Sequence, residues 1–269
     1  MNTRQSEILD LLQKKERVTV RALAEHFKVS PMTIRRDLAE LEERSFLIRT
    51  HGGGLPTTKL RLLQRAFPNF TVSAEKEAIG KLAASQVGPG QTIMVDSGTT
   101  ALEVARNLPR NFDLTIATTS IWVAQELYGS SLRLVLFGGF MREGFPSTYG
   151  PQTEAMLKEF HAHVLFIGCD GADSRNGFYT NDLLTVGLEQ QMMSVAERVI
   201  LVAESAKFTR KALVRYATAD QVDVVVTDSS LSSTDRKNLE KQGVTILVAE
   251  EEEVSHGQVR RSRTARTGA

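Results

Sequence analysis

The sequence has little of several features that would place it in a special class of protein. It contains a single cysteine, Cys169, in 269 residues, which excludes an intrachain disulfide and fits a reducing cytoplasm. No apolar run approaches the roughly 20 residues of a membrane-spanning helix, and no apolar segment follows the first charges as in a signal peptide. We therefore expect a cytoplasmic protein with no membrane partner.

The charges of the chain are nearly balanced. Lys and Arg number 33 and Asp and Glu number 32, which gives a formal net charge of +1. The chain is therefore not a polycation that binds nucleic acid without selectivity, and any affinity for DNA must come from a local patch. Walker and Gly-x-Ser-x-Gly sequences are also missing.

A helix-turn-helix is predicted near the start of the chain. Ser30 can cap a helix by accepting a hydrogen bond from a free amide, and Pro31 falls at the first helical position, where its missing N–H is not needed. Apolar spacing marks two earlier helices, at 3–14 and 20–27, and the short turn Lys28-Val29-Ser30 separates the second of them from the third. The third helix has a buried stripe at helical spacing, formed by Ile34, Leu38 and Leu41.

The face of the third helix opposite this stripe suits a DNA groove. Its polar and short side chains include two adjacent arginines, and Arg36, Met32 and Thr33 are predicted to read bases. Alternating residues before Gly52-Gly53-Gly54 indicate a strand and turn, and this wing, together with Arg35, would hold phosphates. A solvated amphipathic helix is the alternative, which the turn and the wing disfavour. The predicted DNA-binding residues are Ser30, Met32, Thr33, Arg35, Arg36, Arg49 and His51.

The stretch from Thr33 to Gly54, TIRRDLAELEERSFLIRTHGGG, resembles the signature of the DeoR family of bacterial transcriptional regulators. The family has a glycine where this chain has Ser45, a departure that alters the end of the helix, because glycine reaches the left-handed cap conformation most easily. The resemblance implies a winged helix-turn-helix over residues 1–55 that binds double-stranded operator DNA. A linker is expected at 56–72.

A second domain is predicted over residues 73–250. It contains apolar, β-rich runs with no clean alternation, which is typical of strands buried on both faces of a parallel sheet. Helical segments fit between most of the runs, so we expect a Rossmann-like α/β fold. Residues 251–269 read as a disordered basic tail. The runs are 92–95, 114–117, 132–136, 164–167, 199–202, 222–226 and 245–248.

Polar motifs follow four of these runs directly, at the ends of strands where parallel sheets bind ligands. Asp96-Ser97-Gly98-Thr99-Thr100 opens a helix and predicts a phosphate-binding nest of backbone amides, and Gly138-Gly139 would let the backbone approach a ligand. Asp170 and Asp173 would bind sugar hydroxyls, and Lys207 would supply a positive charge. Asp96 as a helix cap and Lys207 as a solvated lysine are the plain alternatives. The predicted effector-binding residues are Asp96, Ser97, Gly98, Thr99, Thr100, Gly138, Gly139, Asp170, Gly171, Asp173 and Lys207.

These motifs are also similar to the effector-binding domain of DeoR regulators, which resembles ribose-5-phosphate isomerase. The resemblance covers nearly all of residues 3–250. It implies a repressor of a carbohydrate-utilisation operon, released by a phosphorylated sugar, with no cofactor and assembled as a homodimer or homotetramer. Relatives usually carry a glutamate where this chain has Thr185, which puts the effector in doubt. The stretch 197–200 points to amino-sugar branches, such as galactosamine-pathway repressors.

Two other functions are compatible with the sequence. One is a sugar-phosphate isomerase with a DNA-binding appendage, because Glu189 falls near the catalytic glutamate of those enzymes, although the loop 174–181 lacks their lysine. The other is a metal site at His161-x-His163, with both rings on one face of a strand but no further histidine and no cysteine pair near it in the sequence. We expect neither catalysis nor a bound metal.

Overall fold

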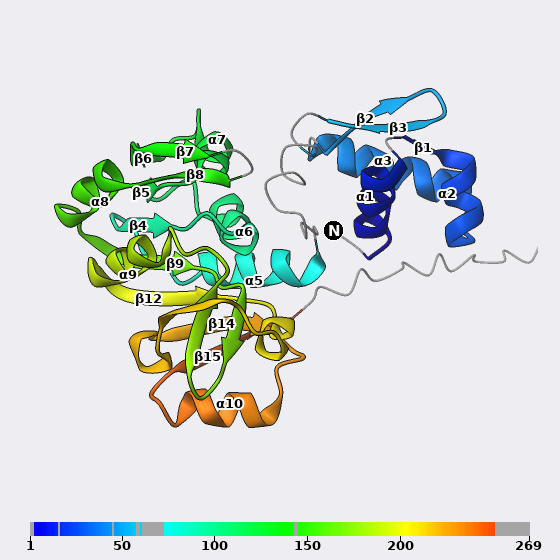
Figure 1. Ribbon diagram of the computed structural model, residues 1–269. Coiled ribbons are helices and arrows are strands. Elements are labelled where there is room, and N and C mark those ends of the chain that lie inside the picture. The colour runs from blue at the N-terminus through cyan, green and yellow to red at the C-terminus, as the bar shows by residue number, and fades with distance from the viewer. Residues whose placement is uncertain are drawn as a thin grey trace, which may run out of the picture.

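The computed structural model describes residues 3–15, 17–44, 46–57, 60, 73–142 and 145–250. An N-terminal winged-helix domain and a larger α/β domain lie side by side (Figure 1). Ser45, most of the predicted linker and the basic tail 251–269 lie outside the described residues. No helix in these ranges combines the length and the apolar character that crossing a bilayer requires.

The winged-helix domain has the elements predicted for it. Its helices are α1 (Thr3–Lys15), α2 (Val20–Phe27) and α3 (Pro31–Glu43), and its antiparallel sheet has the order β1-β3-β2, from β1 (Val18–Thr19), β3 (Gly53–Pro56) and β2 (Leu47–Thr50). The Ser30 hydroxyl accepts a hydrogen bond of 3.2 Å from the Thr33 amide, which confirms the predicted cap of α3. Lys28 ends α2 in the left-handed conformation, with φ of 53°.

The predicted stripe of α3 forms the core of this domain, and Ile34, Leu38 and Leu41 are all buried. Asp37 is also buried, on the side of α3 that faces α1. Its carboxylate accepts two hydrogen bonds from the Arg4 guanidinium of α1, at 2.5 and 2.9 Å. A buried charge needs such a partner, so this pair fixes how α1 lies across α3.

The α/β domain is built on one seven-stranded sheet, and all of its neighbouring strands are parallel. Every predicted run is a strand of this sheet, which confirms the fold class. The order is β15-β14-β12-β9-β4-β5-β6. The strands are β4 (Thr92–Val95), β5 (Thr115–Thr118), β6 (Arg133–Leu136), β9 (Ala162–Ile167), β12 (Ala196–Val202), β14 (Val224–Asp228) and β15 (Thr245–Ala249).

Helices cover both faces of this sheet, as its continuous apolar strands require. Successive strand residues alternate between two cores: Ile93 and Val95 pack on one face, and Met94 packs on the other. One core includes side chains of α5 (Ala74–Ala84), α6 (Thr99–Asn107) and α7 (Ile121–Leu127). The other includes side chains of α8 (Pro151–Lys158), α9 (Val186–Ser194) and α10 (Ser233–Glu240).

Short antiparallel elements were not predicted. A second sheet has the order β10-β11-β13, and a hairpin pairs β7 with β8. These strands lack the continuous apolar run that marked the strands of the parallel sheet, and β8, β10 and β11 contain proline, glycine or aspartate. These elements are β7 (Phe140–Arg142), β8 (Phe145–Tyr149), β10 (Gly171–Asp173), β11 (Gly177–Thr180) and β13 (Val214–Ala217), with 3-10 turns η1 (Ser205–Thr209) and η2 (Ala219–Gln221).

Close packing of α5 against α6 depends on Gly80. A Cβ atom at this position would lie 2.6 Å from Glu103 of α6, whereas a Cβ at Gly187 in α9 would meet nothing within 4 Å. We expect Gly80→Ala to destabilise the protein by about 1–3 kcal/mol through overpacking. Gly187→Ala should be neutral or more stable by up to about 1 kcal/mol, because alanine favours the helix. Urea unfolding measures both, and equal effects of the two changes would contradict the packing argument.

Candidate functional site

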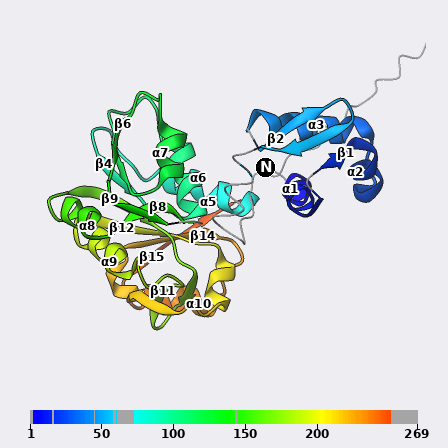
Figure 2. The same cartoon turned by 45° about the horizontal axis from the view of Figure 1, so that its top comes forward.

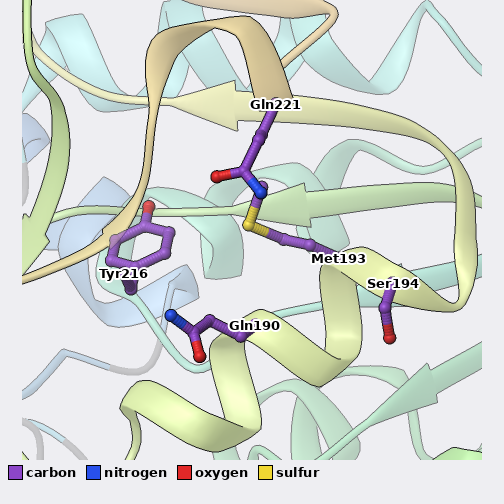
Figure 3. A pocket seen from close by; sticks show the side chains of 5 residues that line it. All are labelled: Gln190, Met193, Ser194, Tyr216 and Gln221. Carbon is purple, nitrogen blue, oxygen red and sulfur yellow. The ribbon is translucent and has the colours of Figure 1, made fainter.

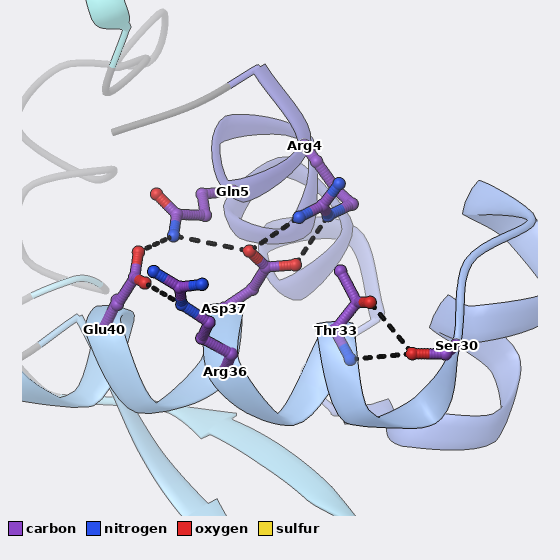
Figure 4. Close-up of polar contacts among 7 residues, drawn as sticks. All are labelled: Arg4, Gln5, Ser30, Thr33, Arg36, Asp37 and Glu40. Atoms are coloured by element: carbon purple, nitrogen blue, oxygen red, sulfur yellow. Dashed lines mark hydrogen bonds and ion pairs between the residues drawn. The ribbon is translucent and has the colours of Figure 1, made fainter. Parts of the chain in front are cut away.

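The recognition helix α3 presents an exposed surface of few side chains. Met32 is 69% exposed, and Arg35 and Arg36 are exposed beside it. The predicted residue Ser30 differs from these, because its hydroxyl contacts both the amide and the hydroxyl of Thr33 (Figure 4). Ser30 therefore holds the start of the helix, and the side chains most available to a DNA groove are Met32, Arg35 and Arg36.

The wing is attached to the end of α3 through Arg49. The Glu42 carboxylate accepts hydrogen bonds from the Arg49 amide at 2.9 Å and from its Nε at 2.7 Å, and these bonds lower the pKa of Glu42. Arg49 thus positions the wing in addition to any contact with phosphate. His51 lies exposed in the turn between β2 and β3.

Arg35 lies at the edge of a hollow of about 380 Å³ between the wing turn, α2 and α3. The hollow brings Arg35 and Arg21 to the same side of the domain as the wing turn. Cations grouped in this way suit the phosphate backbone of DNA. The lining residues are Val20, Arg21, Ala24, Glu25, Pro31, Arg35 and Gly52.

The predicted nest opens α6 at the carboxyl end of β4. Gly98 is the N-cap of α6, and among the described residues no side chain caps the helix there. Asp96 does not cap it either, because its carboxylate accepts hydrogen bonds from the amides of Ser97 (2.6 Å) and Gly168 (3.2 Å) and so ties β4 to the end of β9. The first amides of α6 are therefore left for an external acceptor.

The two predicted aspartates of the third motif lie at opposite ends of β10. Asp170 is exposed at its start and accepts a hydrogen bond of 2.8 Å from the Asn181 amide. Asp173 is the last residue of the strand, and its carboxylate accepts bonds from the amides of Arg175 and Asn176 in the hairpin turn that follows. The structure does not bring Asp173 to the edge where Asp96 and Asp170 meet, because the motif is a strand and not a loop.

The predicted glycines pack against the protein itself. A Cβ at Gly171 would lie 2.6 Å from the Arg210 carbonyl oxygen. Gly139 has a φ of 154°, and its Cβ would lie 2.0 Å from Thr153 Oγ1. The Gly138 carbonyl accepts a hydrogen bond of 2.7 Å from the same Thr153 hydroxyl. Gly171 lies close to the connection between η1 and β13, and Gly139 lies close to α8. This packing accounts for a glycine at these positions without a ligand.

Glu189 is a site residue that the effector prediction omitted. It lies on α9, and its raised pKa, about 8, results first from burial and then from the negative charges of Asp96 and Asp170. Its Oε1 lies 3.2 Å from the Thr185 hydroxyl, and its buried Oε2 has no hydrogen-bond partner among the described residues. The family resemblance predicts a glutamate at the position of Thr185, and a carboxyl group, that of Glu189, lies one helical turn away.

Lys207 and two buried groups complete this edge of the sheet. Burial raises the pKa of the Cys169 thiol to about 12, and the nearby Lys207 ammonium opposes this only in part. Such a thiol is a poor nucleophile at neutral pH. Burial also raises the pKa of Tyr216, whose hydroxyl donates a hydrogen bond of 2.7 Å to the Gly168 carbonyl. Asp170, Glu189 and Lys207 are thus the titratable groups that we expect to meet a ligand here.

A hollow of about 240 Å³ lies between α9 and β13. Figure 3 shows the side chains of Gln190 and Met193 on α9 turned toward Tyr216 and Gln221. The Gln221 amide oxygen already accepts bonds from the Thr218 amide and hydroxyl. Tyr216 also belongs to the sheet edge that holds Asp170 and Glu189, but none of the predicted effector-binding residues lines this hollow.

The histidine pair considered as a metal site has other contacts. His161 lies 2.9 Å from Glu197, and Nδ1 of His163 accepts a hydrogen bond from the Thr92 amide. Within the described ranges, no group of three histidine, cysteine or acidic residues could hold a metal ion.

Comparisons with known protein families match both domains. The DeoR-like helix-turn-helix domain matches residues 4–58, and the DeoR C terminal sensor domain matches residues 71–229. The chain belongs to the DeoR family. It is therefore a DNA-binding transcriptional regulator with a sensor domain, as the resemblance predicted, and this function is favoured over the isomerase alternative.

Several DeoR-family proteins are similar to this protein over most of its chain. The transcriptional regulator GlpR of Haloferax volcanii is 31% identical over 91% of this chain and 96% of its own. The glycerol-3-phosphate regulon repressor of Escherichia coli K12 is 33% identical over 84% of this chain and 90% of its own. The repressor GlcR of Bacillus subtilis is 32% identical over 91% and 95%.

Solved structures similar to this DeoR-family chain are distant. A ribose 5-phosphate isomerase from Methanocaldococcus jannaschii is 17% identical with a TM-score of 0.37, and the two structures match over 49% of this chain and 52% of the isomerase. The full-length sorbitol operon regulator SorC from Klebsiella pneumoniae is 13% identical with a TM-score of 0.34, over 89% and 99%. Neither likeness is close enough to bear on function.

Glu189 makes the folding stability of the sensor domain depend on pH, and the direction follows from its raised pKa. Because its pKa is higher in the folded state than its ordinary value of 4.5, the folded protein binds more protons than the unfolded chain between these values. The contribution of Glu189 to the free energy of unfolding is therefore largest below about pH 4.5 and decreases as the pH rises toward about 8.

We expect Glu189→Gln to raise the melting temperature at about pH 8.5, by the equivalent of roughly 1–3 kcal/mol, and to change it little near pH 5. Thermal unfolding at the two pH values measures this. The exposed Glu159→Gln is the control and should change neither value. The same shift at both pH values for Glu189→Gln would show that the carboxyl group is not titrating in this range.

Proposed function

We propose that this DeoR-family protein is a cytoplasmic repressor of a carbohydrate-utilisation operon, and that a phosphorylated sugar releases it from its operator. The observation that supports this is the uncapped start of α6 at the sheet edge that also holds Asp170 and Glu189. Free helix amides bind phosphate, and carboxyl groups accept hydrogen bonds from sugar hydroxyls. The name of the Escherichia coli relative, a glycerol-3-phosphate regulon repressor, fits a phosphorylated effector.

The proposed effector site uses fewer residues than the sequence predicted. The amides of Gly98, Thr99 and Thr100 hold the phosphate, together with the hydroxyls of Ser97, Thr99 and Thr100, and Asp170 and Glu189 face the sugar. Lys207 adds a positive charge from η1. Asp96, Gly138, Gly139 and Gly171 shape the site through the contacts described above, and Asp173 has no part in it.

The proposed DNA site places α3 in the major groove. Met32, Arg36 and Thr33 face bases, and Arg35, Arg49 and His51 lie near phosphates. Helix-turn-helix proteins pair half-sites through two-fold symmetry, so we propose a homodimer or homotetramer as the active form.

Helix α5 provides a route between the two sites. In both views it lies on the side of the α/β domain next to the winged-helix domain (Figure 1, Figure 2). The buried Lys76 reaches toward the effector edge, with its Nζ 3.7 Å from Glu204, the residue that precedes η1 and Lys207. Its neighbour Glu77 accepts two hydrogen bonds, at 2.8 and 3.1 Å, from the guanidinium of Arg44, the C-cap of α3.

A second contact joins the domains through α6. The Arg106 guanidinium lies over the Phe46 ring at 5.5 Å and also pairs with Glu103 of the same helix. The opposite end of α6 is the proposed phosphate site. A ligand that moves either α5 or α6 therefore acts on the residues that end the recognition helix, and the coupling of sugar and DNA binding must be reciprocal.

Thermal unfolding can test the proposed phosphate site. Thermal unfolding of the full chain is compared across sugar phosphates and their unphosphorylated parents, and a ligand of the folded state raises the melting temperature by mass action, equivalent to about 2.7 kcal/mol at 100-fold its dissociation constant. Gly98→Asp should abolish this shift, because aspartate caps the helix well and places a carboxylate where the phosphate would bind. Gly88→Asp adds the same charge at another turn and should preserve it. A retained shift in Gly98→Asp would overturn the assignment.

A substitution in α5 can test the coupling between sugar binding and DNA binding. Glu77→Gln weakens the bidentate contact with Arg44, so the sugar phosphate that gives the largest thermal shift should reduce operator affinity several-fold less than in the unchanged protein. The sugar should still bind, as its thermal shift reports. Glu75→Gln alters the same helical turn and should leave the coupling intact. Equal coupling in both variants would exclude the α5 route.

A further inference from the structure

Arg36 is the most exposed part of a continuous polar chain in the winged-helix domain. Its side chain is 80% exposed, and its Nε donates a hydrogen bond of 3.1 Å to Glu40 Oε1, one helical turn further along α3. Among the described residues, Glu40 is the hydrogen-bond partner of this guanidinium, and only Nε donates to it. The outer edge of the guanidinium, formed by its two terminal nitrogens, has no hydrogen-bond partner among the described residues.

Glu40 is itself held from the side of α1 (Figure 4). Its Oε2 accepts a hydrogen bond of 2.5 Å from Nε2 of Gln5, a side chain that is only 2% exposed. Gln5 also reaches Asp37 Oδ1 at 3.5 Å, and Asp37 is paired with Arg4. The position of Arg36 is thus connected, through Glu40 and Gln5, to buried groups between α1 and α3.

A second Arg–Glu pair in the domain lacks this support. Arg21 and Glu25 of α2 have the same spacing and a similar distance, 3.0 Å, but their side chains are 90% and 68% exposed. In the described part of the chain, Arg21 is the partner of Glu25, and no further residue holds that carboxylate. An isolated exposed pair of this kind contributes little, whereas a carboxylate fixed on its other oxygen can hold an arginine in one orientation.

An arginine held in one orientation is expected to prefer guanine over the other bases. Two terminal guanidinium nitrogens match the O6 and N7 acceptors of guanine in the major groove, the commonest specific contact of arginine with DNA. Holding the side chain beforehand reduces the entropy lost when that contact forms. We propose that Glu40, positioned by Gln5, holds Arg36 for bidentate recognition of a guanine in each half-site. The proposal rests on the proposed placement of α3 in the major groove.

The test begins with selection of duplexes from a random pool by the unchanged full-length protein. Binding of the selected duplex is then compared with duplexes changed at each position, for the unchanged protein and for variants. We expect one guanine per half-site whose replacement weakens binding at least about tenfold, and Arg36→Ala should abolish that preference. Glu40→Ala should reduce the same preference at least threefold and leave the other positions unchanged.

Three further variants separate positioning from charge and from folding. Glu25→Ala removes an equal charge from the matched pair and should leave the guanine preference as it is. Glu40→Gln keeps one oxygen acceptor for Arg36, but its NH2 group can bond to Gln5 only if the Gln5 amide turns over, so it should restore part of the preference. Gln5→Ala should weaken it while Glu40 is intact, and circular dichroism checks that each variant folds.

Several outcomes would overturn the proposal. An unchanged preference in Glu40→Ala would show that Arg36 needs no support, and an unchanged preference in Arg36→Ala would show that Arg36 does not read the guanine. If Glu40→Ala alters a different base pair from Arg36→Ala, then Glu40 reads a base itself, for example the N4 amino group of a cytosine. Failure of the unchanged protein to enrich any sequence would instead contradict the placement of α3 in the groove.

Discussion

Burial of one parallel sheet on both faces is the constraint on which the α/β domain depends. Helices on each side exclude water from the strands, so polar groups can collect only at the strand ends. Because every strand runs in the same direction, the residues after β4, β9 and β12 meet at one edge. Asp96, Asp170 and Lys207 are far apart in the sequence and are brought to that edge by this topology.

The acidic side chains at this edge have different tasks. Asp96 is tied to two backbone amides and holds two strand ends together, whereas Asp170 is exposed. Glu189 is buried with one unpaired oxygen, and its pKa of about 8 leaves it largely protonated at neutral pH. A protonated carboxyl can donate a hydrogen bond as well as accept one, which suits a sugar hydroxyl. Position and burial, more than residue type, separate these roles.

The winged-helix domain uses buried polar contacts in a similar way. Asp37 lies on the inner side of α3 and is satisfied by Arg4, while Glu40 lies at the boundary and connects Gln5 with Arg36. The end of the same helix contacts α5 through Arg44. The recognition helix is thus held at its start by Ser30, along its side by α1 and at its end by the sensor domain.

The sequence alone predicted every element with a strong local signal. Capping and apolar spacing marked the three N-terminal helices, and continuous β-rich runs marked all seven strands of the parallel sheet. The short antiparallel strands of the α/β domain were missed, because β10 and β13 lack a continuous apolar run, and β13 is held by pairing with β11, a partner distant in the sequence.

What only the tertiary structure decided is which polar residues share a site. The sequence motif at Asp170-Gly171-Ala172-Asp173 indicated two equivalent carboxylates, but its strand conformation separates them, and the turn uses Asp173. The sequence linked Glu189 only to the isomerase alternative, and its burial beside Asp96 and Asp170 became visible when α9 was packed beside the sheet edge. The contact of Glu77 with Arg44 likewise appeared only when both domains were in place. Local sequence determines helices, strands and caps, whereas charge proximity and burial depend on chain segments that are brought together only by folding.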